Sequence, residues 1–173
     1  MLDEPPDHGV GRSRGGLSTK IHQLCDGHGL PLVMLIGPGH AHDSPMFTTL
    51  MDQLRVPRLG VGRPRTRPAA VLGDKAYSSR ANRVHLRSRG IEAVIPEPSL
   101  QIGHRQRRGS RGGRPVGFDS QKYKCRNVIE RSFNTIKNWR GLATRYDKLA
   151  ITYRAAALLA AICAWLRHLR DTP

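Results

Sequence analysis

The chain has 173 residues and a mass of 19.2 kDa, which suits one domain. Its 29 Lys and Arg against 13 Asp and Glu give a formal net charge of +16, which excludes an ordinary neutral metabolic enzyme as the first interpretation. Such an excess favours a polyanionic partner, either nucleic acid or an anionic membrane surface.

The first part of the chain predicts a β-hairpin. Residues 1–16 are rich in Pro, Gly and Arg and predict an irregular, basic lead-in. The loose alternation of residues 17–25 and the apolar run of residues 30–36 predict two antiparallel strands, joined by a turn at residues 26–29. The second strand is expected to be well buried, because its apolar run is continuous.

A helix and a βαβ unit are predicted next. Pro45 stands in the first turn of the helix, and Asp43 or Ser44 is expected to cap it. A basic, Pro-rich loop follows over residues 55–68. A short buried strand, a polar helix and another strand are then predicted over residues 69–72, 78–89 and 91–95. This order indicates parallel neighbours in one sheet.

The rest of the chain predicts a basic arm and two helices. Residues 99–117 are Gly-rich, contain no acid and carry Arg105, Arg107, Arg108, Arg111 and Arg114. The helices are expected over residues 119–140 and 150–170. The longest apolar run, residues 155–166, is shorter than the roughly 20 residues of a membrane span. We therefore expect a buried helix there and no membrane partner.

Asp74 directly follows the short buried strand of residues 69–72. In mixed α/β sheets, functional side chains gather at the C-terminal ends of parallel strands. A carboxylate at this position is equally suited to capping the turn or helix that follows. The sequence of this segment leaves both interpretations open.

Glu130 is the only acid between Lys122 and Arg140. Helical periodicity places it on one stripe with Tyr123, Arg126, Asn134 and Lys137. The neighbouring apolar stripe, expected to dock on the sheet, consists of Cys125, Ile129, Phe133 and Ile136. Ion pairs of Glu130 with Arg126 and Lys137, each stabilising by about 0.2–0.5 kcal/mol, would explain an acid beside cations. They do not explain why so basic a helix keeps a single acid.

Asp74 and Glu130 are candidate catalytic and metal-binding residues. Phosphodiester cleavage by two divalent ions needs acidic oxygens from separate elements that converge on one point. Hard oxygen ligands select Mg²⁺ or Mn²⁺. Contacts with double-stranded DNA are expected from the Glu130 stripe and the basic arm, namely from Tyr123, Arg126, Lys137 and the five arginines of residues 99–117.

The spacing Tyr123-x2-Arg126-x3-Glu130-x6-Lys137 matches the Y-(2)-R-(3)-E-(6)-K signature of bacterial insertion-sequence transposases of the DDE class. Four further blocks resemble the insertion-sequence-five group of that class, at Gly11–His22, His42–Ser44, Gly73–Tyr77 and Thr144–Lys148. The resemblance covers nearly the whole chain. It implies a ribonuclease-H-like fold, a mixed sheet flanked by helices, and metal-dependent cutting and strand transfer at terminal inverted repeats.

The resemblance also implies roles for single residues. Asp74 would be the second aspartate of the catalytic triad and Glu130 its glutamate, while Tyr123, Arg126 and Lys137 would hold DNA near the cut. It further implies a homodimer that acts on paired transposon ends. Such a protein is expected in the bacterial cytoplasm, associated with the nucleoid.

One element of the family pattern is missing. In this family the first aspartate lies on the first strand, upstream of the Gly11 block. Asp3 and Asp7 precede that block but lie in Pro- and Gly-rich surroundings, so neither is assigned the role. That strand is central in a ribonuclease-H-like sheet, and its loss leaves two sheet edges unpaired. We expect residues 17–171 to form a truncated domain, inactive alone, that an upstream-frame product completes by fusion or docking.

Two other functions remain open. A truncated, non-catalytic remnant would still bind DNA and compete with intact transposase for the transposon ends. A general basic RNA- or DNA-binding protein would account for the charge but not for Asp74 at a strand end or for the Glu130 stripe. Replacement of Glu130 by Gln separates these functions, because it removes cleavage and leaves binding.

Overall fold

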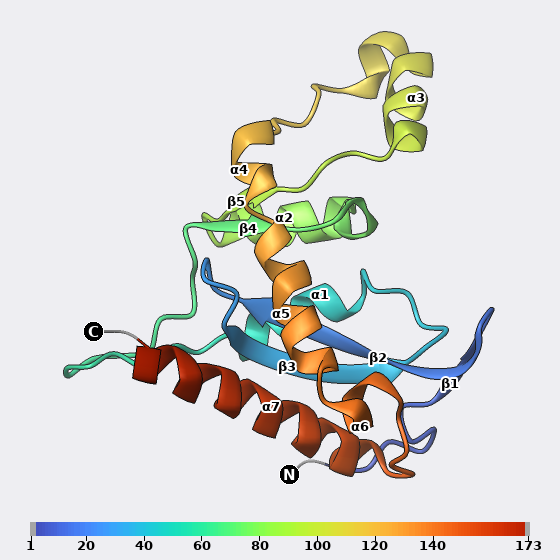
Figure 1. Ribbon diagram of the computed structural model, residues 1–173. Helices are drawn as coiled ribbons and strands as arrows, with labels where there is room; N and C mark the ends of the chain where they lie inside the picture. The colour runs from blue at the N-terminus through green and yellow to red at the C-terminus, as the bar shows by residue number, and fades with distance from the viewer. Residues whose placement is uncertain (1–2, 172–173) are drawn as a thin grey trace.

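Two small sheets with helices on both sides make up the computed structural model, which describes residues 3–171 (Figure 1). The strands are β1 (Gly11–Ser13), β2 (Gly16–Cys25), β3 (Pro31–Pro38), β4 (Ala70–Leu72) and β5 (Glu92–Val94). The helices are α1 (Met46–Gln53), α2 (Arg80–Ser88), α3 (Ser99–Arg107), α4 (Ser120–Lys124), α5 (Asn127–Lys137), α6 (Arg140–Ala143) and α7 (Ala150–Asp171), with short 3₁₀ turns η1 (Lys75–Tyr77) and η2 (Gly109–Gly112).

The predicted hairpin is confirmed as β2 and β3, which pair antiparallel with a register shift between Leu24 and Cys25. Its turn forms because the carboxylate of Asp26 accepts hydrogen bonds from the backbone N–H groups of His28 and Leu30, both at 2.9 Å. An aspartate that bonds to the backbone ahead of it stabilises such a turn.

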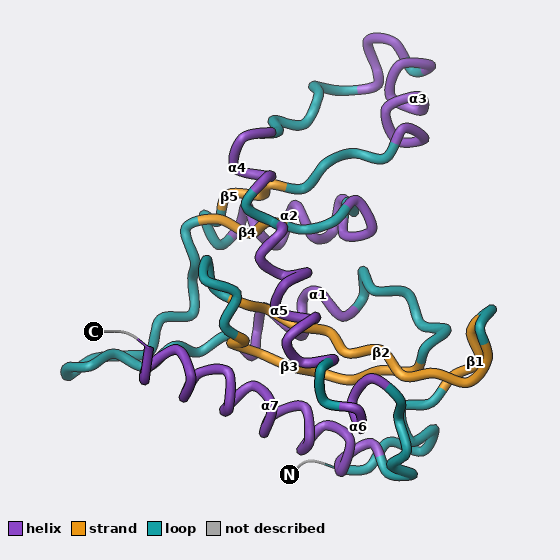
Figure 2. Tube along the Cα trace, in the orientation of Figure 1, coloured by secondary structure: helices purple, strands orange, loops and turns teal. Residues whose placement is uncertain are grey.

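Alternate side chains of β3 enter two separate hydrophobic cores, because successive residues of a strand face opposite sides. Val33 and Leu35 pack with α1, α2, β4 and β5 on one side. Met34 packs with residues of α5, α6 and α7 on the other. The helices therefore form a layer on each face of β3, α1 on one side and α5 and α7 on the other (Figure 2).

The predicted βαβ unit is confirmed, since β4 and β5 pair parallel and α2 connects them. The strands of residues 3–171 form a three-stranded sheet in the order β1-β2-β3 and a separate two-stranded sheet of β4 and β5, in agreement with the expectation that a missing central strand leaves two sheet edges unpaired. In this part of the chain β4 pairs only with β5, and β2 pairs with β1 only through residues 16–18. Each sheet keeps an unpaired edge, and the shared core under α1 holds the two sheets together.

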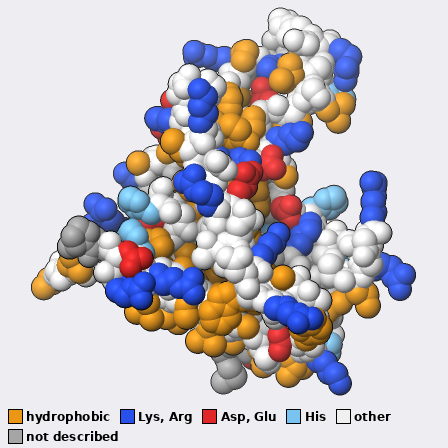
Figure 3. All heavy atoms as spheres, viewed as in Figure 1, with side chains coloured by type: hydrophobic (Ala, Val, Ile, Leu, Met, Phe, Trp, Pro, Cys, Tyr) orange, Lys and Arg blue, Asp and Glu red, His pale blue; other side chains and the backbone are white. Residues whose placement is uncertain are grey.

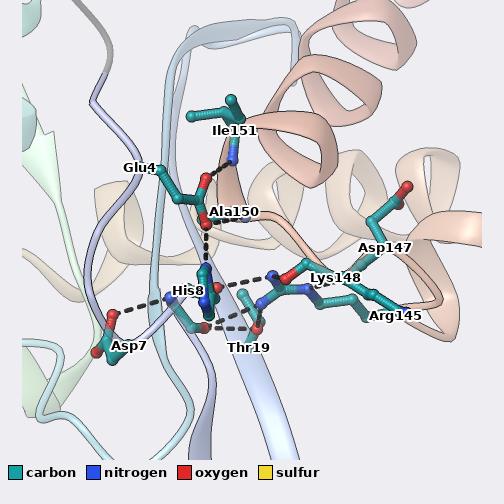
Figure 4. A network of polar contacts seen from close by, with 10 residues as sticks. Glu4, Asp7, His8, Thr19, Arg145, Asp147, Lys148, Ala150 and Ile151 are labelled. Carbon is teal, nitrogen blue, oxygen red and sulfur yellow. Dashed lines mark hydrogen bonds and ion pairs between the residues drawn. The ribbon is translucent and has the colours of Figure 1, made fainter.

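The lead-in of residues 1–16 differs from the prediction, because its end forms β1 and its start is bound to α7 (Figure 4). The carboxylate of Glu4 accepts hydrogen bonds from the backbone N–H groups of Ala150 and Ile151, at 2.7 and 2.9 Å. These groups open the first turn of α7, where the helix offers unpaired donors. Partial desolvation alone would raise the pKa of Glu4, but these donors and His8 lower it. Arg145 adds a hydrogen bond to the His8 carbonyl at 2.7 Å. Residues 1–2 lie outside the described part.

Two predicted elements of the second half are subdivided. The arm of residues 99–117 is not irregular throughout, because it contains α3 and η2, and it projects away from the sheets (Figure 1). The helix expected over residues 119–140 is three helices, α4, α5 and α6. At the first break, Arg126 N–H bonds to the Tyr123 carbonyl at 2.9 Å, three residues back instead of four. This tighter spacing turns the chain between α4 and α5.

Helix α7 confirms the helix expected over residues 150–170, but the prediction that it is buried is only half correct. Its alanine face, including Ala157 and Ala160, is buried against β3. The opposite face exposes Leu158, Leu159, Ile162, Leu166 and Leu169. A helix that packs on a sheet buries only the stripe of residues that faces the sheet. Of the described helices, α7 alone has the length and apolar composition to cross a membrane.

The core under α1 should dominate the stability of the fold. Met51 is completely buried there, so Met51→Ala is expected to lower the free energy of unfolding by about 2–5 kcal/mol. Leu59→Ala is the control, because Leu59 is fully exposed, and we expect a change within about 0.5 kcal/mol. Urea unfolding followed by circular dichroism measures both. Equal losses in the two variants would contradict this assignment of the core.

Candidate active site

Asp74 leaves the sheet at the C-terminal end of β4. The preceding Gly73 is buried, and a Cβ there would lie 3.3 Å from Cγ1 of Ile95, so the chain packs tightly up to this point. Asp74 itself is exposed, and its carboxylate accepts a hydrogen bond from the Lys75 backbone N–H, which caps η1. Both interpretations from the sequence are compatible with this geometry: Asp74 is a cap, and its carboxylate faces solvent at a strand end.

Tyr77 lies beside Asp74, at the end of η1, with its ring 5.8 Å from that of Phe47. Burial raises the pKa of its phenol to about 12, and the negative charges of Asp43 and Asp74 add to this effect. The phenol is therefore protonated at neutral pH. Two carboxylates from different elements thus act on one tyrosine.

Asp43 belongs to the segment between β3 and α1. The prediction that Asp43 or Ser44 caps α1 is wrong, because Pro45 holds the cap position and no side chain bonds to the helix start. The Asp43 carboxylate instead lies 3.0 Å from Nζ of Lys20 and 4.0 Å from Nδ1 of His22. Burial lowers the pKa of His22, against the opposing charge of Asp43. Lys20 is consequently the cation that holds Asp43.

Asn82 connects this segment with the turn that carries Asp74. It is buried on α2, and its side-chain amide donates to Oγ of Ser44 at 3.1 Å and to the carbonyl of Tyr77 at 3.0 Å. The position of η1 relative to α1 is therefore fixed by hydrogen bonds as well as by the shared core.

Glu130 and Arg126 form the ion pair expected from their helical spacing, with Nη2 and Oε1 2.6 Å apart. Partial burial alone would lower the pKa of Arg126, but its hydrogen bond to Glu130 and the negative charges of Glu130 and Asp74 raise it. Glu130 therefore binds this guanidinium directly, and Asp74 contributes only the smallest of these charge effects. Acidic side chains gather near the centre of the face drawn in Figure 3, with Lys and Arg side chains around them.

The other residues of the predicted stripe are arranged around this ion pair. The guanidinium of Arg126 lies over the Tyr123 ring, 5.6 Å from its centroid. Lys137 ends α5 and is exposed, and no ion pair joins it to Glu130 among the described residues. Tyr123 thus lies next to the two charges of the site, while Lys137 is left open to solvent.

The apolar stripe predicted to dock on the sheet is wrong in part. Ile136 is buried as expected, but Cys125 is exposed, because the chain turns between α4 and α5. The buried polar residue of α5 is Ser132, whose hydroxyl accepts a hydrogen bond from the Gln23 amide at 2.6 Å. This bond and Ile136 fix α5 on the hairpin and so set where Glu130 emerges.

The arginines of the arm fall into two groups. Arg105 donates to both carboxylate oxygens of Glu97 at 2.5 Å, and both side chains are largely buried. The others are exposed and have no acidic partner within residues 3–171; they are Arg107, Arg108, Arg111 and Arg114. Arg105 therefore stabilises the base of α3, and the other four offer their charge to a ligand.

Asp74 and Glu130 supply the hard oxygen atoms that divalent ions prefer. Residues 3–171 contain no group of three or more His, Cys, Asp and Glu side chains arranged to hold a metal ion. Mg²⁺ in proteins is commonly bound through one or two carboxylates, with water and substrate phosphates as the other ligands. The donor set here fits that mode.

Comparison with known proteins decides the family. The model of the transposase DDE domain matches residues 3–166. The chain belongs to the DDE transposase family. It is 31% identical over 151 residues to a transposase for insertion sequence element IS6501 of Brucella ovis, covering 87% of this chain and all of the relative. It is also 31% identical to a transposase for element IS402 of Burkholderia cepacia, covering 80% of this chain and 57% of that relative. No solved structure matches the chain.

This DDE transposase domain contains two site neighbours that the sequence did not single out. Asp43 and Tyr77 lie within the blocks His42–Ser44 and Gly73–Tyr77, which carried the resemblance. Their presence in those blocks is the feature of the sequence that could have identified them as neighbours of the site. The electrostatic effect of Asp43 and Asp74 on Tyr77 depends on the packing of α1 against the turn that carries Tyr77, which no local pattern predicts.

Tyr77 makes the stability of the domain sensitive to alkaline pH. Its folded-state pKa of about 12 exceeds the ordinary value of 10.0, so the stability from the protonated phenol is complete below pH 10 and is lost as pH rises towards 12. We expect the wild type to lose up to about 2 kcal/mol more than Tyr77→Phe over this window. Urea unfolding at pH 9 and 12 measures the difference, with the exposed Tyr146→Phe as control. Parallel profiles of wild type and Tyr77→Phe would refute it.

Proposed function

We propose that this chain is the catalytic part of a transposase that cuts and joins DNA at the terminal inverted repeats of an insertion sequence. Its membership in the DDE transposase family supports a role in transposition. The observation that carries the finer proposal is that Asp74 is exposed just beyond the C-terminal end of β4, while Glu130 is exposed on α5 and paired with Arg126 at 2.6 Å. Carboxylates from separate elements near one point are what phosphodiester cleavage requires.

Asp74 and Glu130 would hold the divalent ion, Mg²⁺ or Mn²⁺, in this proposal. DDE transposase domains in general use such ions. When bound, one such ion would activate the attacking hydroxyl and a second would stabilise the leaving oxygen. The chain's own contribution is to present two carboxylates, and to release Glu130 from Arg126 so that both oxygens are available.

Double-stranded DNA would be held by the cations around this point. Arg126, freed from Glu130, and the exposed Lys137 would contact phosphates near the cut, and Tyr123 would bind a phosphate oxygen or stack on a base. The exposed arginines of the arm would follow the backbone further away. This accounts for α3, which projects from the sheets and carries a cluster of cations (Figure 1).

The third carboxylate of the triad would come from a separate segment. The unpaired edges of β2 and β4 support this, since a strand between them would join the two sheets. An upstream-frame product, fused or docked, would supply such a strand in a ribonuclease-H-like arrangement. In this proposal the protein acts as a homodimer on paired transposon ends, in the cytoplasm at the nucleoid.

The alternative is a non-catalytic remnant that competes for transposon ends. It is favoured by the finding that residues 3–171 contain no group of three potential metal ligands. A remnant binds DNA without any dependence on divalent ions. The response of DNA binding to Mn²⁺ therefore separates the two functions without requiring cleavage.

Glu130→Gln provides the test. Without metal, this variant releases Arg126 to DNA, so the logarithmic salt slope of binding should steepen by about 0.9, the contribution of one phosphate contact. With Mn²⁺, the wild type should bind duplex DNA more tightly, while Glu130→Gln and Asp74→Asn should not respond. Fluorescence anisotropy of the full chain with a labelled duplex measures both effects.

Glu92→Gln is the matched control, because Glu92 also pairs with a cation, Lys122, at 2.7 Å. It removes one charge and frees one cation, as Glu130→Gln does, but it should keep the Mn²⁺ response. A wild type whose DNA affinity is indifferent to Mn²⁺ would overturn the catalytic proposal and leave the remnant. A wild type that binds no DNA would overturn both.

A further inference from the structure

The loop between α1 and β4 carries many positive charges that do not belong to the candidate active site. Residues 55–67 contain no acid. Five arginines lie here, exposed and without an ion pair or side-chain hydrogen bond in the described chain: Arg55, Arg58, Arg63, Arg65 and Arg67. Free cations at this density indicate a polyanionic ligand.

The base of this loop is fixed to the domain. Val56 and Arg65 exchange two backbone hydrogen bonds, at 2.9 and 2.8 Å, which close the loop as a short hairpin. Arg89, at the C-terminal end of α2, donates to the carbonyl of Met51 before the loop, at 3.3 Å, and to that of Thr66 near the end of the loop, at 2.6 Å. The loop therefore extends from a defined position at the edge of the molecule (Figure 2).

The returning limb of the loop is extended and spaces its arginines regularly. Pro64 and Pro68 hold the residues before them in an extended conformation and have no N–H for pairing with another strand. Residues two apart in an extended chain lie on the same side, about 6–7 Å apart. The limb thus presents a row of three cations, at Arg63, Arg65 and Arg67.

The tip of the loop is apolar and slender. Leu59 and Val61 are more exposed than in an extended reference chain, at 113% and 109%. They alternate with Gly60 and Gly62, which add no side chain, and Gly62 adopts a positive φ of 144°. Nothing in residues 3–171 covers these two side chains, so they are available to a ligand together with the arginines.

We propose that the loop of residues 55–68 inserts into the minor groove of duplex DNA and prefers narrow A·T tracts. The narrow groove has an enhanced negative potential that attracts arginine. Proteins that bind there also press apolar side chains against the base steps, as Leu59 and Val61 would. The inference rests on the proposed function only in that the ligand is DNA. It adds a contact that reads groove shape, separate from the site of Asp74 and Glu130.

Arginine-to-lysine substitutions test this inference, because they keep the charge and remove the guanidinium. The loop variant is Arg63→Lys, Arg65→Lys and Arg67→Lys together. The control makes the same change three times in the arm, at Arg107, Arg108 and Arg111. Each full-length chain is titrated against two labelled duplexes of equal length, one of A·T pairs and one of G·C pairs, and against vesicles containing anionic lipid.

The wild type should bind the A·T duplex about fivefold or more tightly than the G·C duplex, an advantage of about 1 kcal/mol. The loop variant should bring this ratio within about twofold, and the arm control should keep the ratio, with any change in affinity the same for both duplexes. Equal affinities for the two duplexes in the wild type, or an unchanged ratio in the loop variant, would overturn the inference and leave the active-site proposal intact.

Loss of vesicle binding with an unchanged ratio would assign the loop to a lipid surface. Absence of DNA binding in the wild type would overturn the proposed function itself.

Discussion

Alternate side chains of β3 pack into two separate hydrophobic cores, and the position of each candidate catalytic residue depends on one of them. Val33 and Leu35 bind α1, which in turn holds β4 and the turn of Asp74. Met34 lies in the core that seats α5, and therefore Glu130, on the opposite face of the hairpin. A strand buried on both sides thus connects two halves of a site whose residues are 56 positions apart in the sequence.

Electrostatic interactions of Arg126 also link the two candidate catalytic residues. The guanidinium of Arg126 takes the negative charge of Glu130 by direct contact and that of Asp74 through space. A cation paired with one carboxylate also lowers the repulsion that this carboxylate would exert on a second one nearby. The guanidinium is released when a metal cation replaces it beside Glu130, or when a phosphate replaces Glu130 beside it. The ion pair is therefore compatible with DNA chemistry.

The sequence predicted the elements whose signals are local. The β2–β3 hairpin follows from two apolar strands around a turn, and Glu130 was found from the spacing of its helical stripe. Contacts between distant segments were not predictable in this way. Glu4 caps α7 although more than 140 residues separate the two in the sequence. Cys125 is exposed and not buried as predicted, because the chain turns tightly between α4 and α5. The split into two sheets agrees with the unpaired edges expected from the missing central strand, an expectation that came from the family resemblance and not from periodicity.

Convergence of Asp74 and Glu130 on one metal site is the central claim, and iron-directed cleavage of the polypeptide tests it most directly. Fe²⁺ placed at a Mg²⁺ site generates radicals that cut the backbone beside its ligands. With ascorbate and peroxide, the full chain should be cut near residues 74 and 130 at equal iron concentrations, and excess Mg²⁺ or Mn²⁺ should suppress both cuts together. Cutting at only one of the two positions, or cuts that Mg²⁺ does not suppress, would contradict a shared site.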